Sequence, residues 1–162
     1  MRLSHWFTGR GDSGITDLIG GRRVKKSDAI ITALGNIDEL SAELGACRAV
    51  LGHDHEYSTI LHDRQKELIA LMGCLASGFD FKCTHFIDEI IKKLNEKIQM
   101  PSEFIIPGCN KVEATLNISR TVCRRAERSV VAAKAGEDII AYLNRLSTLL
   151  FILTVATKDC KD

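Results

Sequence analysis

The 162-residue chain is short of proline, of net charge and of alternating sequence. It holds two prolines, Pro101 and Pro107, so long stretches are open to helix formation. The formal net charge of +1 at pH 7 gives no electrostatic reason to expect nucleic acid or an anionic membrane as a partner. No convincing run alternates apolar and polar residues, which is the pattern of a half-buried strand. These absences favour a helical protein that binds neither nucleic acid nor membrane.

The six cysteines include no C-x-x-C pair, and the first nine residues contain no secretory signal. Reduced thiols in a cytoplasmic protein are therefore a simpler expectation than disulfides or a zinc site. The segment "HDHE" at residues 53–56 has metal-ligating side chains, but it follows Gly52 between two helical patterns. We expect a polar loop there and no dedicated protein metal site.

The chain length and composition, 45% apolar and 27% charged, are typical of one soluble globular domain over residues 1–162. Apolar residues recur at helical spacing in five segments, which we place at about residues 37–51, 57–77, 87–98, 111–135 and 138–158. Gly52 ends the first, Pro101 stops the third and Gly136 closes the fourth. The prediction is an all-α bundle of four or five helices with a glycine-rich N-terminal loop.

The fifth predicted helix is apolar on two faces, so it is either central to the bundle or spans a membrane. Four polar residues interrupt its apolar run well short of a membrane span: Asn144, Arg145, Ser147 and Thr148. We therefore expect a central helix.

The N-terminal stretch "TGRGDSGIT" places Gly9, Gly14 and Thr16 at the spacing of a Walker A phosphate loop, with Ile15 in place of the lysine. Such a loop needs a strand before it and a helix after it, and only eight residues precede Gly9. The Walker reading therefore fails. Two readings remain open: a solvated arm, or an anion nest in which Asp12 holds a phosphate-bound Mg²⁺ and Lys25 or Lys26 supplies positive charge.

The segment "SRTVCRRAERSVV" places Arg120, Arg124 and Glu127 on one stripe of a helix, beside an apolar face. These residues either form salt bridges within the helix or act as a phosphate clamp, since the guanidinium group binds phosphate oxygens in pairs. The spacing does not distinguish the two.

Three further residues stand out by position. Asp38 lies beside the apolar stripe of the first predicted helix, where a carboxylate calls for an arginine partner. Asn144 is expected to be a buried amide that needs hydrogen-bond partners. Phe104 precedes a Pro-Gly turn, and a phenylalanine there is more often core than functional.

Three blocks of the sequence, in order, resemble the ATP:cob(I)alamin adenosyltransferases of the propanediol-utilisation type. The blocks are "FTGRGDSGIT…GGRRVKK", "ALGNIDELSAELG" and "FIIPGCN…SRTVCRRAERSVV…YLNRLSTLLFIL", and together they cover nearly the whole chain. The third is the most specific of the three. Five positions depart from the family pattern: Ala29, Ile30, Leu34, Ser41 and Cys109.

The resemblance implies a helical trimer in which ATP and the corrinoid meet at a subunit interface. It assigns residues 1–27 to a nucleotide-binding loop and residues 28–162 to the bundle. It implies contacts to the triphosphate and Mg²⁺ from Thr8, Gly11, Asp12, Gly14, Thr16 and Lys26. It implies that the bundle holds the nucleotide through Arg124, Glu127 and Asn144. Asp38 and Arg120 match the family's intersubunit ion pair, and Phe104 matches the aromatic residue that blocks the lower face of the corrin.

The activity that the resemblance implies is transfer of the 5′-deoxyadenosyl group of ATP to the Co(I) of cob(I)alamin, which yields adenosylcobalamin and triphosphate. Implied partners are a flavin-type reductase and a cobalamin-dependent enzyme that takes the product. Two alternatives stay open: a non-catalytic carrier of ATP and corrinoid, and a structural bundle whose basic stripe is only solvated.

Overall fold

The computed structural model describes residues 9–82 and 85–158, so the prediction for Thr8 lies outside the described residues. Within them lie five helices: α1 (Ala29–Leu51), α2 (Glu56–Ser77), α3 (His85–Asn95), α4 (Lys111–Ala132) and α5 (Glu137–Ala156). The predicted all-α architecture is confirmed. The third helix ends at Asn95, earlier than predicted; one further turn follows, with Ile98 N–H bonded to Leu94 O at 3.0 Å, and so Pro101 is not what stops the helix.

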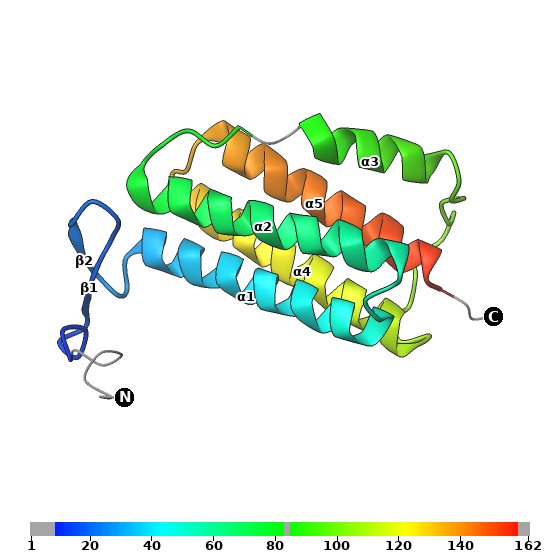
Figure 1. Ribbon diagram of the computed structural model, residues 1–162, viewed down its shortest axis with the longest axis horizontal. Coiled ribbons are helices and arrows are strands. Elements are labelled where there is room, and N and C mark those ends of the chain that lie inside the picture. Colours follow the sequence, from blue (N-terminus) through cyan, green and yellow to red (C-terminus); the bar gives the residue numbers. More distant parts are fainter. Residues whose placement is uncertain (1–8, 83–84, 159–162) are drawn as a thin grey trace.

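The helices pack as neighbours in a layered bundle (Figure 1). Helix α1 packs against α2 and α4, α4 packs against α5, and α3 lies on α5. The N-terminal hairpin projects from the end of the bundle where α1 begins and α4 ends. Both ends of α4 are therefore close to loops that the sequence marked as functional.

A small antiparallel hairpin, β1 (Ile15–Asp17) with β2 (Arg23–Lys25), was not predicted. Its register pairs Ile15 with Lys25 and Asp17 with Arg23. Each strand has three residues, which is too short for an alternating pattern to be recognised. Gly20 and Gly21 form its turn with φ of 89° and 82°, values that favour glycine.

Side chains cap the helices that follow loops. Asp28 Oδ1 accepts from Ile30 N–H at 3.1 Å at the start of α1. His55, in the "HDHE" segment, caps α2 because its Nδ1 accepts from Tyr57 N–H at 3.1 Å. The segment is thus a polar loop that begins a helix.

The core is one cluster to which all five helices contribute, and α5 contributes the most. By length and hydropathy α5 could cross a membrane, but more than half of its apolar stretch is buried in the bundle. Its buried residues occupy most of its circumference, as expected of a central helix. Beyond its first turn, the exposed positions of α5 are confined to a narrow strip that consists of Asn144, Thr148 and Phe151.

A buried polar network ties α2 to α5. Arg64, 4% exposed, pairs through Nη2 with Glu67 Oε1 at 2.6 Å. The Tyr142 hydroxyl donates to Glu67 Oε2 at 2.7 Å. A buried ion pair that also satisfies a tyrosine hydroxyl fixes the register of two helices more than it adds stability.

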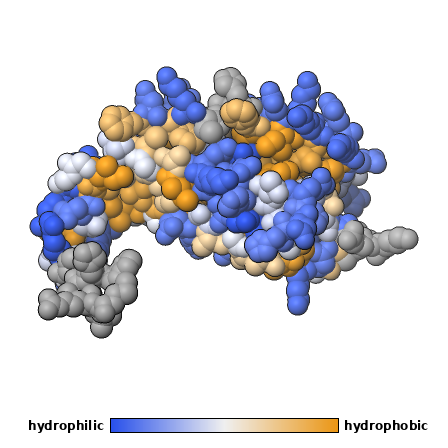
Figure 2. Space-filling model, in the orientation of Figure 1, coloured by the Kyte–Doolittle hydropathy of each residue, from blue (hydrophilic) through white to orange (hydrophobic). Residues whose placement is uncertain are grey.

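The surface is a mosaic of hydrophilic and hydrophobic residues (Figure 2). On the face shown, hydrophobic residues gather where the hairpin meets the bundle and along the line between α2 and α3. Large exposed apolar side chains also include Phe104, Ile106 and Ile118.

Cys109 is disulfide-bonded, so the expectation of reduced thiols is wrong for this residue. Cys47, Cys74 and Cys123 are free. Local sequence could not reveal the bond, because a disulfide depends on which Cα atoms the fold brings together.

Cys47 and Cys123 should resist alkylation in the folded protein. Burial raises the pKa of the Cys47 thiol to about 11 and raises that of Cys123 as well, so both remain protonated at pH 8. Iodoacetamide at pH 8, followed by peptide mass spectrometry, should modify them only after denaturation. Rapid labelling of either residue in the native protein would contradict the packing of α4 against α1 and α5.

Candidate functional site

The glycine-containing loop at residues 9–14 is a sequence of tight turns. Asp12 N–H bonds to Gly9 O and Gly14 N–H to Gly11 O, each at 3.1 Å. Gly9 and Gly14 have φ of 67° and 77°, which an L side chain rarely adopts. A strand follows the loop rather than a helix, so the exclusion of a Walker loop is confirmed.

The hairpin returns Lys26 to this loop. Lys26 N–H bonds to Gly14 O at 2.8 Å. A Cβ atom at Gly11 would lie 3.1 Å from Lys26 Nζ, so the absence of a side chain at Gly11 leaves room for the ammonium group. The fold thus places Lys26 against Gly11 and Gly14, two of the predicted loop residues, and Asp12 and Thr16 lie on the same short segment.

Two arginines form salt bridges with one aspartate of the hairpin. Arg10 and Arg23 each approach Asp17 at 3.3 Å, and all three side chains are at least 40% exposed. Such exposed pairs contribute little stability.

On α4 the predicted stripe is present, but its intrahelical salt bridges are not. Arg120 Nε donates to Asn117 Oδ1 at 2.8 Å. Within residues 9–82 and 85–158, neither Arg124, which is exposed, nor Glu127 has a hydrogen-bond or ion-pair partner. The side chains of Arg124 and Glu127 are therefore available to bind a ligand, as the interpretation of this stripe as a phosphate clamp requires.

Asn117 is a residue that the sequence analysis missed. It is 7% exposed and holds Arg120 by its Nε, which leaves both terminal nitrogens of the guanidinium free to face outward. The signal was present as an asparagine three residues before Arg120 on a helix, a spacing at which side chains meet.

Helix α5 runs antiparallel to α4 and supplies the other wall of the site. Asn117 and Arg120 share a cavity with Phe151 and Thr154. The same register, continued along both helices, sets Glu127 at the level of Asn144. Polar side chains thus lie along both helices: Asn117, Arg120 and Glu127 on α4, and Asn144 and Thr154 on α5. We call these two rows the α4–α5 tracks.

The prediction that Asn144 is a buried amide is wrong, since its side chain is exposed. Apolar residues surround its position on α5, but it falls on the narrow strip that faces away from the core. Its backbone carbonyl accepts from the Ser147 hydroxyl at 2.9 Å, and its amide group faces solvent.

Asp38 is also exposed, so its carboxylate is not held against the core as expected. Within the described part of the chain it has no ion-pair partner, and it does not meet Arg120. The neighbouring Glu39 instead pairs with Arg125 of α4.

Phe104 stands on the loop before α4 and is fully exposed, at 104% of its reference area, so it is not core. It borders a cavity of about 410 Å³ together with Arg120 and Phe151. An aromatic ring, a cation and a second aromatic ring thus meet at the outer edge of α4 and α5.

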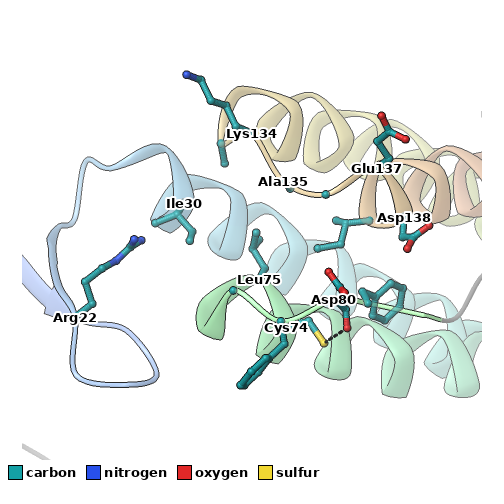
Figure 3. A pocket seen from close by; sticks show the side chains of 15 residues that line it. Arg22, Ile30, Cys74, Leu75, Asp80, Lys134, Ala135, Glu137 and Asp138 are labelled. Atoms are coloured by element: carbon teal, nitrogen blue, oxygen red, sulfur yellow. Dashed lines mark hydrogen bonds between the residues drawn. The ribbon is translucent and has the colours of Figure 1, made fainter.

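A cavity of about 680 Å³, larger than the one beside Phe104, lies between the α2–α3 and α4–α5 connections (Figure 3). Of its lining residues, Lys134 and Glu137 direct their charged ends away from it. None of the predicted site residues lines it, so cavity size does not locate the site.

The comparisons with known proteins agree with one another. A family model described as cobalamin adenosyltransferase matches residues 6–157. A cobalamin adenosyltransferase from Cupriavidus metallidurans is 37% identical, with 94% of this chain and 87% of the relative covered. A corrinoid adenosyltransferase from Citrobacter freundii is 36% identical, with 96% of each chain covered.

Solved structures with the same fold include a variant of the PduO-type ATP:corrinoid adenosyltransferase from Lactobacillus reuteri complexed with cobalamin and ATP. It superposes with a TM-score of 0.86 at 26% identity, with 94% of this chain and 93% of that chain covered. A second variant of that enzyme, complexed with ATP, gives a TM-score of 0.84 at 27% identity. Taken with the family model, these matches show that the chain belongs to the cobalamin adenosyltransferase family.

Proposed function

We propose that this protein transfers the 5′-deoxyadenosyl group of ATP to the Co(I) of cob(I)alamin and releases triphosphate. The observation that carries the proposal is the family match over residues 6–157, which includes both the N-terminal loop and the α4–α5 tracks. The relatives named above are corrinoid adenosyltransferases, and one related structure holds cobalamin and ATP.

The triphosphate would bind at the N-terminal loop. Backbone N–H groups of glycine-containing turns form an anion nest, and Lys26 Nζ lies beside Gly11 to add positive charge. Thr8, Gly11, Asp12, Gly14 and Thr16 would line it. Residues 1–27 would then serve as the nucleotide-binding loop of a single domain whose bundle is 28–162.

Mg²⁺ would be held by Asp12 together with phosphate oxygens. Mg²⁺ commonly binds through one or two carboxylates plus substrate phosphates rather than in an all-protein cage. Such a site needs a single carboxylate from the protein, which Asp12 can supply. Among the described residues, no three His, Cys, Asp or Glu side chains cluster as a metal site.

The active site would be completed by a second copy of the chain. Within residues 9–82 and 85–158, no hydrogen bond or ion pair joins the loop at 9–26 to Arg124, Glu127 or Asn144, and the side chains of Asp38 and Arg124 make none. A homotrimer would bring the loop of one subunit to the α4–α5 tracks of the next, with Asp38 pairing across to Arg120. Exposed Phe104, Ile106 and Ile118 would be covered at the same interfaces.

The reaction requires the protein to position C5′ of ATP against cobalt and to neutralise the charge on the triphosphate. It requires no general base. Cobalt(I) donates its electron pair to C5′ of ATP, the Co–C bond forms, the C5′–O bond breaks, and the electron pair leaves on triphosphate. Binding both substrates so that cobalt lies in line with the C5′–O bond lowers the entropic barrier to the transfer. Arg124, Lys26 and the loop N–H groups stabilise the charge that develops on the leaving group.

Phe104 would serve the step before transfer. Five-coordinate Co(II) is difficult to reduce in water, and an apolar wall below the corrin excludes the lower axial ligand. The resulting four-coordinate Co(II) accepts an electron more readily. Electrons would come from a flavin-type reductase in the cytoplasm, and a cobalamin-dependent enzyme would take the product.

The test of the proposal is an anaerobic assay with chemically reduced cob(I)alamin, Mg-ATP and the protein. Protein-dependent loss of the Co(I) absorbance, with a photolabile alkylcobalamin and triphosphate as products, is expected. If Co(I) persists although Mg-ATP binds, the protein is a carrier instead. If Mg-ATP neither binds nor raises the melting temperature, the basic stripe is only solvated.

Phe104→Ala should fold and bind Mg-ATP as the wild type does, because the side chain is fully exposed. It should lose turnover that starts from cob(II)alamin and retain far more of the turnover that starts from pre-reduced cob(I)alamin. Parallel assays from the two oxidation states measure the difference. Equal turnover from cob(II)alamin in variant and wild type would disprove the lower-face role.

Arg124→Ala should weaken Mg-ATP binding roughly 10- to 100-fold, because a hydrogen bond to a charged group contributes about 1.5–3 kcal/mol. Arg128→Ala is the matched control, since Arg128 is another exposed arginine of the same helix. Isothermal titration with Mg-ATP compares the two. Similar affinities for both variants would remove Arg124 from the nucleotide site.

A further inference from the structure

We propose that Glu113 is a positioning residue that fixes the loop carrying Phe104, and so sets where the aromatic wall stands. The inference rests on the proposed function, because Phe104 must form that wall. The Glu113 side chain is buried within the subunit and contacts neither substrate.

The geometry begins with a buried carboxylate. Glu113 is the third residue of α4 and is fully buried. Its Oε2 accepts hydrogen bonds from the backbone N–H groups of Gly108, at 2.7 Å, and Cys109, at 3.1 Å. Both groups belong to the end of the segment between α3 and α4 that carries Phe104.

The bonding departs from an ordinary capping box. In that motif the N-cap side chain accepts from the third helical N–H, and the glutamate at that third position returns to the N-cap N–H. Asn110 Oδ1 does accept from Glu113 N–H at 2.9 Å. The Glu113 carboxylate, however, reaches beyond Asn110 to the two residues before it. Asn110 caps the helix, and Glu113 holds the loop.

This arrangement has a cost that helix formation does not explain. Glu113 Oε1 is buried and has no hydrogen-bond partner among the described residues. A buried carboxylate with one unsatisfied oxygen is destabilising unless its other contacts compensate. An uncharged residue would begin the helix without that cost. The two bonds to the loop are what the carboxylate contributes.

The loop depends on its ends, because its middle has little packing of its own. Phe104 is 104% exposed and Ile106 86% exposed. Gly108 has φ of 113°, so the chain turns sharply between the two bonded amides, those of Gly108 and Cys109. One and two turns beyond Glu113 on α4, Asn117 and Arg120 line the cavity that Phe104 borders. Glu113 therefore ties the wall to the helix that forms the opposite side of the same cavity.

The test compares Glu113→Ala with Glu113→Gln, whose amide oxygen can still accept both bonds. Leu68→Ala, at a fully buried position on α2, is the control for general destabilisation. All variants are assayed with a thiol reductant, so that the Cys109 disulfide does not hold the loop in place of the glutamate. The readouts are Mg-ATP affinity, the electron paramagnetic resonance signal of four-coordinate cob(II)alamin, and turnover from cob(II)alamin and from cob(I)alamin.

Glu113→Ala should bind Mg-ATP normally, lose most of the four-coordinate signal and turn over cob(II)alamin roughly 10- to 100-fold more slowly, as expected for a misplaced group near the reaction. Turnover from cob(I)alamin should fall less. Glu113→Gln should restore the signal, and Leu68→Ala should keep it despite a lower melting temperature. If Glu113→Ala does not fold, Glu113→Asp, one methylene too short to reach both amides, takes its place with the same expectation.

A wild-type four-coordinate signal in the folded Glu113→Ala or Glu113→Asp protein would overturn the inference, as would an equal loss in Leu68→Ala. Failure of the proposed function is recognisable separately. In that case the wild type itself gives no four-coordinate signal, or Phe104→Ala retains it.

Discussion

The packing of α4 between α1 and α5 is the constraint on which the rest of the molecule depends. One face of α4 is buried through Leu116, Cys123 and Val130, which fixes its rotation. The border of that face must then point to the edge of the bundle, where Arg120, Arg124 and Glu127 lie. Any change in rotation would bury two guanidinium groups or expose the core, and both are costly. The buried face of α4 thus determines which of its polar side chains reach the surface.

The two halves of the proposed site are built on different physical principles. The N-terminal half is backbone: tight turns at positive φ, followed by a hairpin with three-residue strands that returns Lys26 to Gly11. The bundle half is side chains on two rigid antiparallel helices, held in register by buried contacts. A backbone nest suits a phosphate chain because its N–H groups are all donors, whereas rigid helices suit a site that must place a reacting carbon.

Helical spacing was enough to predict the helical bundle and the stripe that carries Arg124 and Glu127, and the sequence motifs were enough to predict the family. The same spacing misjudged the burial of Asn144 and Asp38, which lie next to apolar stripes in the sequence but face outward. A residue at the margin of an apolar stripe falls on either side of the burial boundary according to the neighbouring helix. The Cys109 disulfide was missed because neither helical spacing nor local motifs show which cysteines a fold brings together.

The order of the helices, their apolar faces and the loops between them follow from the sequence alone, because hydrophobic spacing and capping residues act within a few turns of the chain. Which polar groups meet across elements depends on how the chain packs. The hairpin that returns Lys26 to Gly11, the hydrogen bond from Tyr142 to Glu67, and the hydrogen bonds of Glu113 to Gly108 and Cys109 all follow from how elements pack or turn back on themselves. Hydrogen bonds require distances of about 3 Å, and that accuracy arises only when the core is closed around them.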